Sequence, residues 1–76
     1  MAWILLDSTS LSAARYQKKR SMLELEFCDG SIYRYLPVPE PRYEELLRAE
    51  SKGRYFNLHI RKNFVWERIR PANKSG

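Results

Sequence analysis

The sequence predicts an α+β fold in which one main helix packs on one face of a three- or four-stranded antiparallel sheet. Residues 23–27 and 32–36 have strand-like patterns on either side of Asp29-Gly30, a pair of residues typical of a hairpin turn. Residues 41–50 instead place apolar side chains at helical spacing. The predicted order of elements is strand, strand, strand, helix, helix, strand.

The length of 76 residues is that of one small domain, predicted to span 1–76 with a core of about 8–69 and a frayed tail at 71–76. A hydrophobic fraction of 43% with 13% aromatic residues is typical of a globular protein. Cys28 is the single cysteine, which excludes an internal disulfide framework. The apolar start at residues 2–6 is too short to span a membrane, so a cytoplasmic location is expected.

The first three strands are predicted from residues 11–17, 23–27 and 32–36. The first has the weakest pattern, because Ala13-Ala14-Arg15 interrupts it. The second alternates strictly between leucine or phenylalanine and glutamate, as a strand with one buried face does. The third is rich in β-branched and aromatic residues, which favour strands.

The length of the hairpin loop decides where the tyrosines point. A two-residue loop places Arg34 opposite Leu25, and burying a guanidinium among leucines is unfavourable. A three-residue loop, with the glycine in a left-handed bulge position, pairs Leu25 with Tyr33 and Glu24 with Arg34. We therefore predict the bulged register, in which Tyr33 and Tyr35 are mainly core residues and stack on a ligand only if that face is open.

Prolines separate the sheet from the helical part of the chain. The corner at residues 37–39 ends the third strand, and Pro41 suits the first turn of a helix. The side chains that this main helix turns inward are predicted to be Tyr43, Leu46 and Leu47.

A second, short helix is predicted after Ser51, which is a suitable N-cap. Tyr55, Phe56 and Ile60 form its apolar side. Residues 64–69 alternate again and are predicted to be the last strand of the sheet.

Positive charge is concentrated in the last third of the chain. Residues 1–50 carry seven basic and eight acidic side chains, whereas residues 51–76 carry seven basic side chains and Glu67 alone, a net charge of +6. Such a block favours a polyanionic partner, usually a nucleic acid and less often an acidic protein or a membrane surface. The alternative interpretation is a solvated face that keeps a small domain soluble.

The order of these features resembles the KTSC domain, a small module found alone in bacterial proteins and at the C-terminus of some lysyl-tRNA synthetases. The resemblance covers about residues 8–69 and departs from the family pattern at Arg15, where members often carry a small residue. Its attachment to a tRNA synthetase is the basis on which RNA binding has been proposed for the family. The matching residues are 8–11, Tyr16, 23–27, 29–31, 33–35, 38–39, Tyr43, 46–47, 51–57, 60–61 and 66–69.

Catalytic chemistry is not predicted. One histidine and one cysteine cannot form a Cys/His zinc site, and no phosphate-binding glycine loop exists among three scattered glycines. Cys28 and His59 lack an orienting acid or an oxyanion hole that the sequence would place beside them. We therefore expect no enzyme activity, metal or cofactor.

The favoured hypothesis is a binding module for RNA or another nucleic acid, in which cations contact phosphates and exposed rings stack on bases. Tyr55 is the ring best placed by the sequence, and Trp66 is the next. The alternative is an accessory module that docks on an acidic or larger protein through an edge strand. The predicted nucleic-acid contacts are Lys52, Arg54, Tyr55, Asn57, His59, Arg61, Lys62, Trp66, Arg68 and Arg70.

Overall fold

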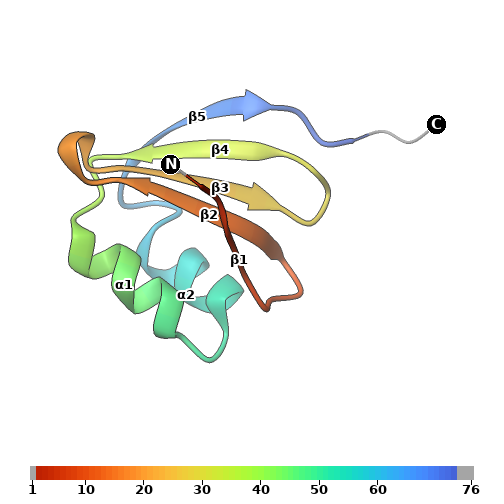
Figure 1. Ribbon diagram of the computed structural model, residues 1–76, viewed down its shortest axis with the longest axis horizontal. Coiled ribbons are helices and arrows are strands. Elements are labelled where there is room, and N and C mark those ends of the chain that lie inside the picture. The colour runs from red at the N-terminus through yellow and green to blue at the C-terminus, as the bar shows by residue number, and fades with distance from the viewer. Residues whose placement is uncertain (1, 74–76) are drawn as a thin grey trace.

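The computed structural model describes residues 2–73 and contains a five-stranded antiparallel sheet with two helices on one face (Figure 1). The α+β class is confirmed. The strands lie side by side in chain order: β1 (Ile4–Leu5), β2 (Leu11–Gln17), β3 (Met22–Phe27), β4 (Ile32–Leu36) and β5 (Val65–Arg70). A short 3-10 helix, η1 (Lys18–Arg20), joins β2 to β3, and the chain between β4 and β5 forms α1 (Glu40–Arg48) and α2 (Lys52–His59).

The predicted three or four strands are too few, because the apolar start of the chain forms β1. Ile4 pairs with Ala14, and Leu5 pairs with Ala13 along the edge of β2. The side chains of Ile4 and Leu5 are 46% and 83% exposed, so β1 has no buried face to produce an alternating pattern. Backbone pairing alone defines this strand, and pairing of that kind leaves little signal in the sequence.

The predicted hairpin register is confirmed. Leu25 lies opposite Tyr33, and Glu24 lies opposite Arg34. Gly30 has a φ of 90°, a left-handed conformation that glycine adopts without the steric cost of a Cβ atom. Leu23, Leu25 and Tyr35 consequently share the face that the helices cover.

The core lies between the first strands and the two helices. Leu46 of α1 and Phe56 of α2 are buried against this face of the sheet. The ring of Tyr16 stacks on that of Tyr43 with 4.7 Å between centroids, and its hydroxyl donates to the Val38 carbonyl at 2.6 Å. This bond ties β2 to the proline-rich corner that leads into α1.

The second helix begins where it was predicted. The Oγ of Ser51 accepts a hydrogen bond from the backbone N–H of Arg54 at 3.3 Å and so caps α2. With eight residues against nine in α1, α2 is not the minor element that the sequence suggested.

The last strand pairs with β4 and forms an exposed edge of the sheet. A register shift between Ile32 and Tyr33 places Arg70 opposite Ile32. Beyond β5, the backbone N–H of Asn73 donates to the Asp29 carbonyl at 2.8 Å. The rest of the predicted frayed tail, residues 74–76, lies outside the described residues.

Candidate functional site

A hollow of about 710 Å³ lies on the helix-facing side of the sheet, beside β4 and β5. Figure 1 shows that these two strands extend past the helices. We call this hollow the ring groove, because aromatic side chains form most of its lining. Its lining residues are Phe27, Asp29, Ser31, Tyr33, Tyr35, Phe56, Asn57, Arg61, Lys62, Phe64 and Trp66.

Two neighbouring rings in the ring groove are open to solvent. Trp66 is 56% exposed, and its ring centroid lies 5.5 Å from that of the half-buried Tyr33. Phe27 meets Tyr33 edge-on at 5.6 Å and supports it from β3. An exposed aromatic face of this kind is available for stacking with a planar ligand.

The inner end of the ring groove is closed by Phe56 of α2. Its ring packs edge-on against Phe27 at 5.3 Å and against Tyr35 at 5.4 Å. Phe56 and Tyr35 are both buried. The groove is therefore open at the β5 side and packed like a core at the α2 side.

The charged side chains that line the ring groove are mainly cationic. Arg61 and Lys62 follow α2 and are exposed, whereas Asp29 is the acidic residue of the lining. The Asp29 carboxylate accepts hydrogen bonds from the backbone N–H and the hydroxyl of Ser31, at 2.9 and 2.6 Å, and these bonds lower its pKa. Asp29 stays ionised and bonded to Ser31. The groove lining therefore carries one negative charge, from Asp29, and two positive charges, from Arg61 and Lys62.

The pKa of Tyr35 reflects its burial and the charges around the groove. Burial is the main cause that raises the pKa of Tyr35 to about 12; Tyr33 adds to the rise, and the charge of Arg61 opposes it. The phenol is therefore neutral at physiological pH and able to donate a hydrogen bond. Arg61 lines the same groove and opposes the rise in this pKa because its positive charge favours the phenolate.

Five of the ten predicted contact residues gather at the ring groove. Asn57, Arg61, Lys62 and Trp66 line it. Arg68 lies opposite Tyr33 in the pairing of β5 with β4, which places it beside the groove on the same face.

The other five predicted residues lie elsewhere. Lys52 and Arg54 line a separate hollow of about 600 Å³ beside residues 7–10. Tyr55 is half-buried, donates to the Glu45 carboxylate of α1 and packs on His59 with 4.5 Å between ring centroids. Tyr55, the ring that the sequence ranked first for stacking, is thus engaged in a contact between the two helices.

Arg70 lies on the opposite face of the sheet, which we call the outer face. Its guanidinium pairs with Glu26 at 2.7 Å and donates to the Gly30 carbonyl at 2.9 Å. The cations of the last third therefore do not form one surface, because a bulge in β5 with Ile69 as the extra residue turns Arg70 to the side of the sheet away from Arg68.

Phe27 and Tyr33 are site residues that sequence reasoning left in the core. The predicted register already placed both on the helix-facing side. The sequence did not show how far the helices extend over the sheet. Tyr33 is half-buried because neither helix reaches over it. The sequence signal that could have identified Tyr33 as a site residue is its pairing with a strand rich in arginine.

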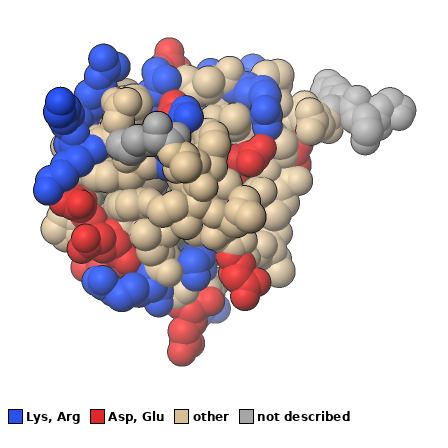
Figure 2. All heavy atoms as spheres, viewed as in Figure 1, with Lys and Arg blue, Asp and Glu red and all other residues tan. Residues whose placement is uncertain are grey.

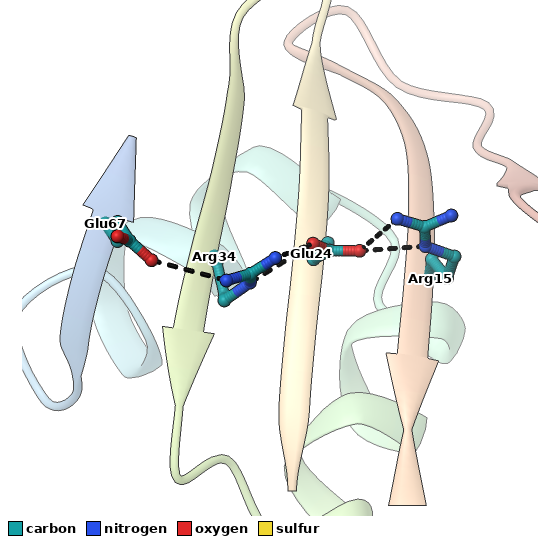
Figure 3. Close-up of polar contacts among 4 residues, drawn as sticks. All are labelled: Arg15, Glu24, Arg34 and Glu67. Carbon is teal, nitrogen blue, oxygen red and sulfur yellow. Dashed lines mark hydrogen bonds and ion pairs between the residues drawn. The ribbon is translucent and has the colours of Figure 1, made fainter. Parts of the chain in front are cut away.

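The outer face carries a row of ion pairs across four strands, as Figure 3 shows. Both Arg15 and Arg34 pair with the buried Glu24, at 2.5 and 3.0 Å, and Arg34 also pairs with Glu67 at 3.3 Å. Burial by itself raises the pKa of Glu24, but the hydrogen bonds from Arg15 and Arg34 outweigh it and hold the pKa below its ordinary value. The predicted pair of Glu24 with Arg34 is confirmed.

Two other features are absent from residues 2–73. Within residues 2–73, no cluster of three or more His, Cys, Asp or Glu side chains has the arrangement of a metal site. Neither helix of this described part is long and apolar enough to cross a membrane.

Comparisons with known proteins agree with the fold. The sequence model of the KTSC domain matches residues 7–64. A solved KTSC domain protein from Yersinia pestis superposes with a TM-score of 0.86 at 31% identity, covering 90% of this chain and 96% of that one.

Proteins of two sizes are similar to this sequence. A lysine–tRNA ligase from Nostoc sp. is 41% identical over 63 residues, which is 83% of this chain and 11% of the ligase. An uncharacterised protein from Stutzerimonas stutzeri is 42% identical over 57 residues, 75% of this chain and 80% of that protein. The chain thus spans about a tenth of the ligases that it matches and most of the small relative.

Proposed function

This chain belongs to the KTSC domain family, and we propose that it is a non-catalytic module that binds single-stranded RNA in the ring groove. The observation that supports this most is the exposed ring of Trp66, 5.5 Å from Tyr33, in a hollow that Arg61 and Lys62 also line. Bases stack on such rings with roughly 1–3 kcal/mol each, and the cations contact the phosphates between them.

The groove favours an unpaired strand over a duplex. Bases in a duplex already stack on one another, whereas those of a single strand are free to stack on Trp66 and Tyr33. Asn57 and the neutral phenol of Tyr35 supply hydrogen-bonding groups for base edges or the ribose hydroxyl. The relatives named lysine–tRNA ligase support RNA as the nucleic acid.

Salt dependence tests the proposal. Three phosphate contacts, from Arg61, Lys62 and Arg68, give a slope of log affinity against log salt of about −2, so affinity for a fluorescent uridine decamer falls about 20-fold between 50 and 200 mM salt. A double variant, Arg61→Gln with Lys62→Gln, leaves one contact and flattens the slope to about −0.7. Fluorescence anisotropy measures both.

Lys19→Gln is the matched control, because Lys19 is an exposed cation of η1 outside the ring groove. Its slope is expected to equal that of the unmodified chain. Absence of decamer binding at 50 mM salt, or equal weakening by Lys19→Gln and the double variant, contradicts the proposal.

The runner-up is a protein-docking module, favoured by the exposed edge of β5. Val65 and Ile69 are 71% and 43% exposed on this strand, whose outer backbone groups have no strand partner within residues 2–73. An extended peptide can add to such an edge. Chemical shifts of the β5 amides that respond to a partner protein but not to the decamer would favour this function.

A further inference from the structure

A third hollow, of about 260 Å³, lies on the outer face near the turn between β2 and β3, on the side of the sheet away from the ring groove. We call it the arginine pocket. Three cations and one carboxylate are among its lining residues, which are Arg15, Gln17, Arg20, Met22, Glu24 and Arg34. The charge balance of this lining is positive.

Glu24 holds two of these arginines in place without using all their donors. Its Oε1 accepts from Nε and Nη2 of Arg15, and its Oε2 accepts from Nε and Nη2 of Arg34. Nη1 of Arg15 takes no part in these bonds, and the ring of Trp3 covers one face of the Arg15 guanidinium at 4.5 Å. The side chains of Arg15 and Arg34 remain 36% and 32% exposed, so a ligand can reach them.

Arg20 adds a charge that the fold leaves free. Among residues 2–73 no carboxylate pairs with it, and it is exposed in η1 between Lys19 and the start of β3. Figure 2 shows Lys and Arg atoms gathered over the end of the molecule where Figure 1 places this turn. Neighbouring positive charges there attract an anion toward the arginine pocket.

Gln17 places an unpaired acceptor beside these cations. Its Oε1 is buried and accepts no hydrogen bond from any group of residues 2–73. A buried acceptor without a donor is unfavourable. Because this oxygen is covered in the fold as it stands, a ligand that brings an O–H group into the pocket satisfies it when the Gln17 amide rotates toward the ligand.

We propose that the arginine pocket binds a phosphate group. Arg15, Arg20 and Arg34 supply planar, charge-assisted donors of the kind that recognise phosphate oxygens. Gln17 accepts a hydrogen bond from the P–OH group that inorganic phosphate and monoesters carry near neutral pH. At about 30 Å³ for each liquid water, the hollow has room for one phosphate and several waters.

The test is a titration of the isotope-labelled chain with inorganic phosphate, in which sodium chloride is lowered to keep the ionic strength constant. Saturable shifts of the backbone amides of β2 and of the side-chain Nε resonances of Arg15, Arg20 and Arg34 are expected. Arg20→Gln weakens binding about tenfold, as loss of a charge-assisted hydrogen bond does. Arg20 is chosen because Arg15→Gln would remove a partner of the buried Glu24.

Two controls separate the arginine pocket from general attraction and from the ring groove. Lys19→Gln removes an equal charge one residue away and is expected to leave phosphate binding within twofold. Arg61→Gln, at the ring groove, is expected to leave it unchanged. Shifts that do not saturate, or equal weakening by Lys19→Gln and Arg20→Gln, overturn the proposal.

Other ligands identify the source of the phosphate and the role of Gln17. A uridine decamer with a 5′-hydroxyl that shifts the Arg20 resonance would identify backbone phosphodiesters as the source, whereas inorganic phosphate acting alone would identify free phosphate or a monoester. Sulfate, which carries no O–H near neutral pH, is expected to bind more weakly. Equal binding of sulfate overturns the role assigned to Gln17.

Discussion

The helix-facing side of the sheet has two ends, and tyrosines serve different purposes at each. At the sealed end, Tyr16 of β2 stacks on Tyr43 of α1, and both are buried. At the ring groove, Tyr33 packs on an exposed Trp66 beside Arg61. The residue type is the same, and only the reach of the helices over the sheet differs. An aromatic strand residue is thus available to a ligand where the covering layer of helices stops.

Truncating one side chain at each end gives the largest contrast. Leu46→Ala removes a side chain with 0% exposure and is expected to lower the free energy of unfolding by about 2–5 kcal/mol, because it leaves a cavity. Trp66→Ala is expected to cost about 1 kcal/mol or less in stability, since its ring is more than half exposed, yet to weaken binding of the decamer roughly 5- to 150-fold through loss of stacking.

Urea denaturation followed by circular dichroism measures the first quantity, and fluorescence anisotropy measures the second. At a temperature where Leu46→Ala remains folded, its affinity for the decamer is expected to equal that of the unmodified chain. A Trp66→Ala variant that loses stability as Leu46→Ala does, with unchanged binding, would show that the ring groove is part of the core.

Removing one hydroxyl at each end is expected to have a smaller effect that still differs between the two ends. Tyr16→Phe leaves the Val38 carbonyl without its donor and is expected to destabilise the fold by about 1–2 kcal/mol. The hydroxyl of Tyr33 has no hydrogen-bond partner within residues 2–73, so Tyr33→Phe is expected to change stability by less than about 0.5 kcal/mol. Matched urea denaturation curves of the two variants test this, and equal losses would remove the distinction between the two ends.

The smallest effect concerns Tyr35, which lies between the two ends. Its folded pKa of about 12 is above the ordinary value of 10.0, so the folded state favours the neutral phenol. The resulting contribution to stability is fully present below pH 10 and is lost as the pH rises through 12. In an ultraviolet titration of the phenolates, Tyr35→Phe is expected to remove a component that ionises near pH 12. Ionisation of Tyr35 near pH 10 would show that water reaches its phenol at the floor of the groove.

Several elements followed from short-range rules. The bulged hairpin was predictable because one register buried Arg34 among leucines and the other paired it with Glu24. The start of α2 was predictable because Ser51 satisfies a backbone donor within one turn. Both choices depend on residues that are neighbours in the sequence or directly across one hairpin.

The site was only partly predictable, for a physical reason that particular residues illustrate. Tyr55 and Trp66 both looked like exposed rings, but Glu45, ten residues before Tyr55 on another helix, occupies the first. Arg70 looked like part of the same cationic surface as Arg61, but a bulge in β5 turned it to the outer face. These outcomes depend on contacts between elements that are distant in the chain.

By itself, the sequence determined the α+β class, the hairpin register and the basic character of the last third, because alternation, turn chemistry and charge act locally. Tertiary structure alone decided that β1 joins the sheet, that the helices end short of Tyr33 and Trp66, and that Arg15, Arg20 and Arg34 meet around one pocket. Coverage of a surface depends on where separate elements pack on one another, and no short stretch of residues encodes it.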